Sequence, residues 1–401
     1  MAQQHTLQDD EMEKICRYSR FQFTIKCLHN LMQIKPKQNF VFSPHNIYEG
    51  LFVIYLSASG ATEQQLKRTL ELPDHIDQKV IIDWVLRRLN RKNEEIVKWS
   101  NYNDKRICWI SRMKSVNTNM KIVFGNELRI VTFHRNRLVN SKKLINEELK
   151  IKTMDYFDQP VKFNNICEKM EFILSTIFYL NDEIPFHTAL FKDKSTNCNK
   201  IRPIRKVLCA ASSKLMMFMK KILLSNDDDL SLFQFAPIIG AEQKEWKVDD
   251  NKLSELVERF MTKEGSEELR KVLDNPESLT EMKKEMPIPL EIFEMQNELE
   301  IDKLLDKLGI QDLLEPDKAT LSNFTKQNLL LGDVKHYAHI CMTPNEVTAD
   351  AVSMFFTKEG GSLNQIKDIS IWKKVKNKSL WLLYCKKRHT ILFIGIMNED
   401  K

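Results

Sequence analysis

The residues best suited to chemistry lie in the run His336-Tyr-Ala-His339-Ile-Cys341, because imidazole and thiolate groups are preferred ligands of zinc. The run has the character of a β-strand, and side chains alternate between the two faces of a strand. His336 therefore faces away from His339 and Cys341, and two ligands on one face do not complete a tetrahedral site. We expect a structural His336 on a buried face, and neither a metal nor another cofactor.

Other patterns that are typical of enzymes are missing. The sequence contains no G-x-G-x-x-G or G-x-x-x-x-G-K loop for phosphate groups, and no G-x-S-x-G elbow for a nucleophilic serine. Many carboxylates lie between Glu281 and Glu300, and we interpret them as a solvated surface. The sequence argues against the common nucleotide-dependent enzymes and hydrolases.

The composition is that of an ordinary globular protein. Of the 401 residues, 42% are hydrophobic and 29% are charged, which excludes a disordered or collagen-like chain. The net charge of +6 is spread along the chain, so we expect no nucleic-acid partner. The N-terminus lacks the basic start and apolar core of a secretory signal, and no apolar run approaches the roughly 20 residues of a membrane span. These features predict a cytoplasmic location; an extracellular one stays open if the N-terminus is incomplete.

The densest basic run brackets an apolar stretch near the C-terminus. It consists of Lys373, Lys374, Lys376, Lys386, Lys387 and Arg388. Two interpretations stay open: solvated loops on either side of a buried strand, or a patch that binds a sulfated polysaccharide or another polyanion.

The elements that must position these residues follow from hydrophobic periodicity. Helices are expected over residues 12–34, 44–57, 62–70, 77–91, 163–180, 253–260, 269–273 and 301–308. Strands are expected over residues 39–42, 107–110, 128–133, 207–211, 230–236, 287–295, 334–342, 380–384 and 390–397. Helices and strands come in runs rather than in strict alternation, which predicts an α+β fold. Residues 343–378 lack strong periodicity, and long loops of this kind are usually functional.

Several segments, taken in order, resemble the serpin family of protease inhibitors. Residues 39–47 read N-F-V-F-S-P-H-N-I, which is similar to the family's N-x-x-x-S-P-x-S-I signature. Residues 304–312 read L-L-D-K-L-G-I-Q-D, which resembles its L-x-x-L-G-I-x-D run. The segments 57–66, 317–322, 334–336 and 390–395 match as well. The order and spacing fit over the N-terminal and C-terminal quarters, whereas residues 165–290 match poorly.

The resemblance implies one domain over residues 1–401, with three β-sheets, about nine helices and an exposed reactive loop within residues 343–378. It implies a monomeric inhibitor rather than an enzyme. A serine or cysteine protease cleaves the loop and is held as an acyl-enzyme while the loop inserts as a new strand into the largest sheet. The family's sheet-opening region corresponds to Ser43, Asn46 and His336, and here Asn46 replaces a serine.

Counting from His336 places the reactive-loop hinge at Pro344, Asn345, Glu346, Val347, Thr348, Ala349, Asp350 and Ala351. Pro344 has no N–H for a ladder bond, and Glu346 replaces a flexible glycine. Alternation directs Val347, Ala349, Ala351 and Ser353 inward and Asp350 outward, so the inward set remains small enough to insert.

The same count places the scissile bond in a window formed by Lys358, Glu359, Gly360, Gly361 and Ser362. Two functions stay open. The first is a suicide inhibitor of a serine-type endopeptidase, with inhibition weakened or lost through the altered hinge. The alternative is a non-inhibitory serpin-fold protein that binds a partner, a small ligand or a polyanion.

Overall fold

The computed structural model describes residues 2–36, 38–92, 102–134, 137–152, 170–183, 187–192, 199–224, 229–239, 247–278, 281–289, 293–315, 318–327, 329, 331–343, 346–357, 369–372 and 379–397. Nine α-helices occur in these ranges. They are α1 (Ala2–Ile34), α2 (Pro44–Ser57), α3 (Gly60–Thr69), α4 (Gln78–Lys92), α5 (Thr118–Phe124), α6 (Leu138–Lys152), α7 (Leu253–Met261), α8 (Lys263–Asp274) and α9 (Asp302–Lys307). None of the helices in the described ranges is both long and apolar enough to cross a bilayer.

Helix α2 shows how local sequence fixes an element that later proves central. Ser43 precedes it, and the Ser43 hydroxyl accepts a hydrogen bond from the Asn46 N–H (3.2 Å), while Pro44 occupies the first turn. Nearly every residue of α2 is buried, as expected for a helix that is apolar around most of its circumference.

The strands form two main sheets. The first seven strands in chain order are β1 (Phe40–Phe42), β2 (Tyr102–Ser111), β3 (Leu128–Val131), β4 (Phe172–Glu183), β5 (His187–Lys192), β6 (Asn199–Ser212) and β7 (Met217–Leu223). The others are β8 (Leu230–Ile239), β9 (Lys247–Val248), β10 (Glu281–Pro289), β11 (Phe293–Glu300), β12 (Asp333–Met342), β13 (Glu346–Phe356), β14 (Ile369–Trp372), β15 (Ser379–Cys385) and β16 (Thr390–Met397).

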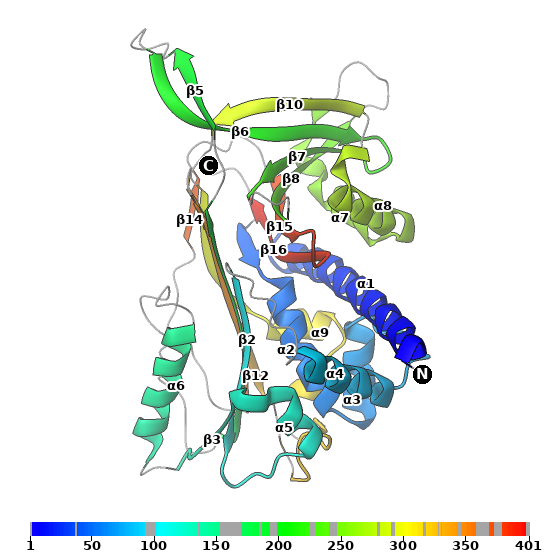
Figure 1. Cartoon of the computed structure of the whole chain (residues 1–401), viewed down its shortest axis with the longest axis vertical. Coiled ribbons are helices and arrows are strands. Elements are labelled where there is room, and N and C mark those ends of the chain that lie inside the picture. Colours follow the sequence, from blue (N-terminus) through cyan, green and yellow to red (C-terminus); the bar gives the residue numbers. More distant parts are fainter. Residues whose placement is uncertain are drawn as a thin grey trace.

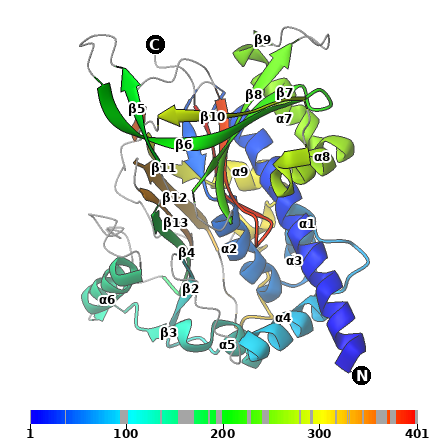
Figure 2. The same cartoon turned by 45° about the horizontal axis from the view of Figure 1, so that its top comes forward.

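A seven-stranded sheet with the order β14-β11-β12-β13-β4-β2-β3 stands between two layers of helices. Figure 1 shows α6 on one side of it, and α2 and α9 on the other. Core residues bear this out: Ile145 and Leu149 of α6 pack in one cluster with Ile107, Trp109 and Val352 of the sheet. Figure 2 shows β13 lying between β12 and β4. Below, the face toward α2 is called the inner face and the face toward α6 the outer face.

The other sheet corrects the expectation of three separate sheets. Residues 199–204 of β6 pair with β5, and residues 207–212 of the same strand pair with β7. Because one long strand serves both neighbours, the remaining strands join into a single nine-stranded sheet. The α+β class and the number of helices agree with the sequence-based expectation.

The prediction of a helix over residues 163–180 was wrong. Residues 172–183 form strand β4, next to β13 in the seven-stranded sheet. Leu174 and Phe178 are buried on its inner face, and Ile173 and Ile177 on its outer face. A strand that is buried on both faces is apolar at nearly every position, so its periodicity does not distinguish it from a helix.

The prediction of a solvated carboxylate surface over residues 281–300 can be compared with the structure at Glu294 and Glu298, which are both half-buried. Two strands, β10 and β11, occupy this segment. On β11, Met295, Asn297 and Leu299 are buried, and Glu294 is half-buried against a histidine of β12. Residues 294–299 of β11 therefore alternate in burial like an ordinary strand.

Candidate functional site

Part of the segment 343–378, which was expected to be an exposed loop, is instead a central strand. Strand β13 pairs antiparallel with β12 from Asp333↔Phe356 to Met342↔Val347, and with β4 from Glu346↔Glu183 to Phe356↔Ile173. The ladder closes at its far end, where the Gly332 N–H donates to the Phe356 carbonyl (2.9 Å). Residues 347–351 of the predicted hinge thus lie inside the sheet, with partners on both sides.

The inner face of β13 carries small residues. Val347, Ala349 and Ala351 are fully buried and pack in one cluster with Phe178 of β4 and Ala338 of β12. This confirms the predicted inward set. Small side chains fit the narrow space between the sheet and the elements beneath it, so a strand that carries them can be added without steric clashes.

A buried polar cluster joins β13 to the start of α2. The Ser43 N–H donates to His336 Nε2 (3.0 Å), and His336 Nδ1 lies 2.8 Å from the Ser353 hydroxyl. Ser353 in turn hydrogen-bonds to Asn46 Oδ1, and Asn46 Nδ2 donates to the Ala351 carbonyl (3.4 Å). The predicted sheet-opening residues Ser43, Asn46 and His336 therefore meet in one network, and the inserted strand completes it.

The network fixes the protonation state of His336. A backbone N–H can only donate, so Nε2 accepts and carries no proton, which leaves the proton on Nδ1 for the Ser353 oxygen. Burial lowers the pKa of His336 from 6.5 to about 3, so the ring is neutral near pH 7. His336 acts here as a structural hydrogen-bonding residue, as its buried position predicted.

The neighbouring strand contributes a residue that sequence reasoning missed. The Thr176 hydroxyl of β4 lies 3.0 Å from the Asn46 carbonyl and 3.1 Å from Asn46 Oδ1. Because residues 163–180 were predicted to form a helix, Thr176 was not recognised as a member of this cluster. Asn46 thus contacts β4 and β13, because its Oδ1 accepts from Thr176 and Ser353 while its Nδ2 donates to the Ala351 carbonyl.

A second missed residue is Gly50 of α2, which lies directly beneath Phe355 of β13. A Cβ atom at position 50 would stand 2.2 Å from Phe355 Cε2. A glycine inside an otherwise bulky, buried helix was the signal that could have revealed this contact. The contact exists only while β13 is in the sheet.

Gly50→Ala is expected to destabilise the inserted form by about 1–3 kcal/mol, because Phe355 must shift in a packed core. In a form with β13 outside the sheet, the same change is expected to stabilise α2 by roughly 0.5–1 kcal/mol, as alanine favours a helix interior over glycine. Protection of the β13 amides in hydrogen exchange measures the balance between the two forms. Adding Phe355→Leu should restore part of the lost protection; a Gly50→Ala variant with unchanged protection would contradict the packing argument.

A comparison with protein-family models identifies the architecture. The model described as Serpin (serine protease inhibitor) matches residues 19–399. The chain belongs to the serpin family. Serine protease inhibitor 88Ea of Drosophila melanogaster is 24% identical over 409 residues, covering 94% of this chain and 89% of that protein.

Solved serpin structures share the fold at low sequence identity. A structure titled cleaved Serpin 42Da superposes with a TM-score of 0.70 at 16% identity, covering 97% of this chain and 98% of that one. Tengpin, a thermophilic serpin in the latent state, gives a TM-score of 0.68 at 17% identity, covering 96% and 98%.

One of the two adverse hinge residues of this serpin, Glu346, lies at the end of the ladder. Glu346 is the exposed first residue of β13, and its N–H donates to the Thr343 hydroxyl (3.2 Å), while the Thr343 N–H donates to the Glu346 carbonyl (2.9 Å). Pro344 and Asn345 lie outside the described residues. The described pairing begins after Pro344, so it requires no N–H from that residue.

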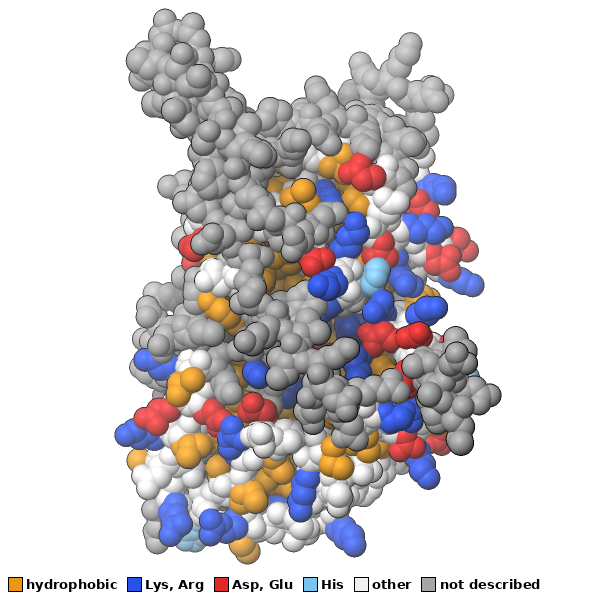
Figure 3. Space-filling model, in the orientation of Figure 1, with side chains coloured by type: hydrophobic (Ala, Val, Ile, Leu, Met, Phe, Trp, Pro, Cys, Tyr) orange, Lys and Arg blue, Asp and Glu red, His pale blue; other side chains and the backbone are white. Residues whose placement is uncertain are grey.

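The scissile-bond window Lys358, Glu359, Gly360, Gly361 and Ser362 lies outside the described residues, as do Lys373, Lys374 and Lys376 of the basic run. The described members of the basic run, Lys386, Lys387 and Arg388, lie in the turn between β15 and β16. Lys387 stands 4.0 Å from Asp229, and Arg388 donates to Asp104 of β2 (3.4 Å). On the face seen in Figure 3, acidic side chains are interspersed among Lys and Arg.

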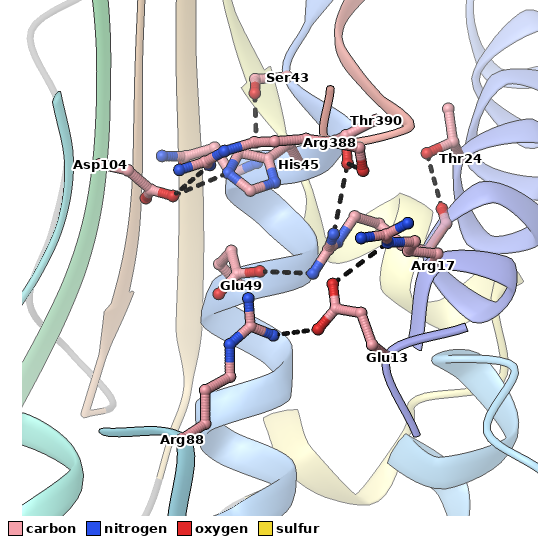
Figure 4. Close-up of polar contacts among 12 residues, drawn as sticks. Glu13, Arg17, Thr24, Ser43, His45, Glu49, Arg88, Asp104, Arg388 and Thr390 are labelled. Atoms are coloured by element: carbon pink, nitrogen blue, oxygen red, sulfur yellow. Dashed lines mark hydrogen bonds and ion pairs between the residues drawn. The ribbon is translucent and has the colours of Figure 1, made fainter. Parts of the chain in front are cut away.

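Arg388 belongs to a group of charged contacts that link the C-terminal hairpin, α2 and β2. Figure 4 shows Arg388 and His45 both directed at Asp104, with His45 Nε2 3.0 Å from its carboxylate. Burial raises the pKa of Asp104, but His45 and Arg388 outweigh that effect and hold it well below its usual range. Arg388 therefore has a structural partner, and the polyanion patch stays a prediction.

The described residues contain no group of three or more His, Cys, Asp or Glu side chains placed to hold a metal ion. His336 and His339 point to opposite faces of β12, toward Ser353 and Asp350 respectively, as strand alternation predicted.

Proposed function

We propose that this serpin inhibits a serine-type endopeptidase by a suicide mechanism based on insertion of β13. The observation that carries the proposal is the complete pairing of Glu346–Phe356 with strands on both sides. The printed name of its fruit-fly relative, a serine protease inhibitor, supports the same class of function.

The chemistry divides between the protease and the serpin. The protease serine oxygen attacks the carbonyl carbon of the scissile residue, the peptide C–N bond breaks, and the amine leaves with a proton. The protease is then esterified to the new C-terminus that follows β13. If β13 enters the sheet before water hydrolyses this ester, the acyl-enzyme is carried along with the strand.

The side chains of β13 support rapid insertion. The inner face of its first half carries no side chain larger than valine, because Val347, Ala349 and Ala351 are the residues on that face. These small side chains can enter between β12 and β4. Ser353 then finds His336 and Asn46 as hydrogen-bonding partners. A polar residue can enter the core because partners for its hydrogen bonds are already present there.

The full-length chain incubated with trypsin-like and chymotrypsin-like proteases should give a band on a denaturing gel at the summed mass of protease and cleaved serpin. A protease whose catalytic serine is replaced by alanine is the matched control, because it binds but forms no ester. Cleavage of the loop without any covalent band, across the panel, would contradict inhibition.

A second candidate function rests on the state of the chain itself. The strand is inserted although the chain is continuous, so the energy that drives a trap has already been released in this form. A serpin that rests in this form would act as a binding protein rather than as a trap. It would resist cleavage in residues 358–362 or be cleaved without a rise in Tm.

A further inference from the structure

Strand β13 carries a buried acid in its middle. Asp350 is 2% exposed, although it points to the outer face, opposite to the small inward set. The sequence predicted its direction, and the structure adds that it is buried. An isolated carboxylate taken out of water is costly unless it is paired and hydrogen-bonded. Insertion of β13 therefore requires a partner for Asp350.

That partner is His339 of β12, which stands opposite Asp350 in the ladder. His339 Nδ1 lies 2.9 Å from Asp350 Oδ1, and His339 Nε2 lies 3.4 Å from Glu294 Oε1 of β11. An ionised carboxylate only accepts hydrogen bonds, so with Asp350 and Glu294 both ionised each ring nitrogen carries a proton. The geometry is that of an imidazolium held between two carboxylates.

Other groups share this face of the sheet. The described titratable residues on it are Asp333, Lys335, Tyr337 and Cys341 on β12, Glu298 on β11, Tyr179 on β4, Lys105 on β2, Arg129 on β3, and Glu346 at the exposed end of β13. Glu148 of α6 faces the same side, but it bonds to Trp109 and Arg129 near the opposite end of β13. Among the described residues, Asp350 and Glu294 supply the carboxylates that contact the His339 ring.

The two carboxylates differ in whether their contact with His339 requires β13 to be in the sheet. Glu294 lies on β11, which pairs with β12 directly, so its contact with His339 does not need β13. Asp350 comes only with β13. Burial lowers the pKa of His339, but the hydrogen bonds and charges of Asp350 and Glu294 outweigh that effect and raise it above its ordinary value. Burial raises the pKa of Asp350, and its bond to His339 offsets part of that rise.

We propose that insertion of β13 is coupled to the uptake of a proton by His339, which then serves as the counter-ion of Asp350 in the sheet. The inference deepens the proposed function, because it rests on insertion of the same strand. It assigns to this chain a pH-dependent latch that acts on the outer face, separate from the neutral His336 cluster beneath the inner face.

The sign of the effect follows from linkage. A histidine whose pKa is raised by a carboxylate that arrives only with β13 favours insertion fully below its pKa in the form without β13, and the gain is lost as pH rises through the higher value. Because one proton is involved, the insertion equilibrium changes by up to about tenfold per pH unit within that window. The inserted form is therefore most stable, relative to the form with β13 outside the sheet, in mildly acidic solution.

Hydrogen exchange of the full-length chain between pH 5.5 and 8.5, corrected for intrinsic exchange rates, tests the latch. Protection of the β13 amides should fall with rising pH in the wild type by up to about tenfold per unit. Asp350→Asn preserves the size of the side chain and should lose this dependence. Glu346→Gln removes the same charge from the exposed end of the strand and should behave as the wild type.

The two proposals fail in different ways. A wild-type chain whose β13 amides lack protection at every pH, both before and after cleavage in residues 358–362, would overturn insertion, and with it the proposed function. Protected amides with the same pH dependence in Asp350→Asn would overturn the latch alone. If Asp350→Asn does not fold, imidazole nitrogen NMR of the wild type decides, with His339→Gln used for assignment: a His339 ring that is neutral at pH 6.5 contradicts the proposal.

Discussion

Replacement of Ala351 by arginine is expected to keep β13 out of the sheet. Ala351 is fully buried between Ala338 of β12 and Phe178 of β4, and its side chain faces the inner core. An arginine there would bury an unpaired guanidinium, which costs several kcal/mol, and would overfill a packed site. With β13 outside the sheet the same side chain is solvated and costs little.

The expected shift in the insertion equilibrium is therefore about a hundredfold or more. After cleavage of the loop, hydrogen exchange should show the β13 amides protected in the wild type and unprotected in Ala351→Arg, and a trapping protease should cleave the variant without forming the covalent band. Glu346→Arg is the matched control, because it adds the same side chain at the exposed end of the same strand. Wild-type protection and trapping in Ala351→Arg would show that the inner face of β13 does not govern insertion.

This prediction could be made largely from the sequence, because alternation alone gives the inward face of a strand. Val347, Ala349 and Ala351 share one parity, and that parity is preserved wherever the strand lies. The start of α2 was equally accessible, since the cap by Ser43 and the proline after it are local signals. Local chemistry predicted what each of these residues does within its own element.

Pairings between segments that are distant in the chain could not be predicted from the sequence in the same way. The contact of Asp350 with His339 depends on the register of β13 against β12, and the sequence placed these residues in a loop and a strand with no fixed relation. The contact of Gly50 with Phe355 joins residues 305 positions apart in the chain, and it exists only in the inserted form. A one-residue slip in register would abolish the first contact, so it had to be observed.

The assignment of β4 failed for a related reason. Its apolar residues face two different cores, and that arrangement is decided by α6 on one side and α2 on the other. The error also concealed Thr176, which contacts Asn46 in the buried polar cluster. One wrong element thus removed one member of the site from view, while Ser43, Asn46 and His336 were still found.

Acidification is expected to destabilise this serpin through His336. Above pH 6.5, neither the folded nor the unfolded chain binds a proton at this residue, so it contributes no pH dependence. Between pH 6.5 and about 3, the unfolded chain binds a proton that the folded chain excludes, since the folded pKa is about 3. The free energy of unfolding therefore falls with falling pH by about 1.4 kcal/mol per unit.

Over the whole window this amounts to roughly 5 kcal/mol, a large part of the stability of an ordinary domain. Guanidinium unfolding midpoints between pH 7 and 4 measure the slope. His336→Gln should flatten it by one proton, because an amide can accept from the Ser43 N–H and donate to Ser353 without titrating. His29→Gln, which replaces a histidine bonded to Gln33 on α1, is the matched control for the substitution itself.

The two histidines of β12 therefore act in opposite directions. The His336 cluster weakens as pH falls below 6.5, whereas the pair of His339 and Asp350 weakens as pH rises. Their positions on opposite faces of one strand mean that each can be removed without touching the other. The double variant His336→Gln with Asp350→Asn should lose both dependences. A residual slope of one proton in that variant between pH 4 and 6.5 would assign the acid sensitivity to a group other than His336.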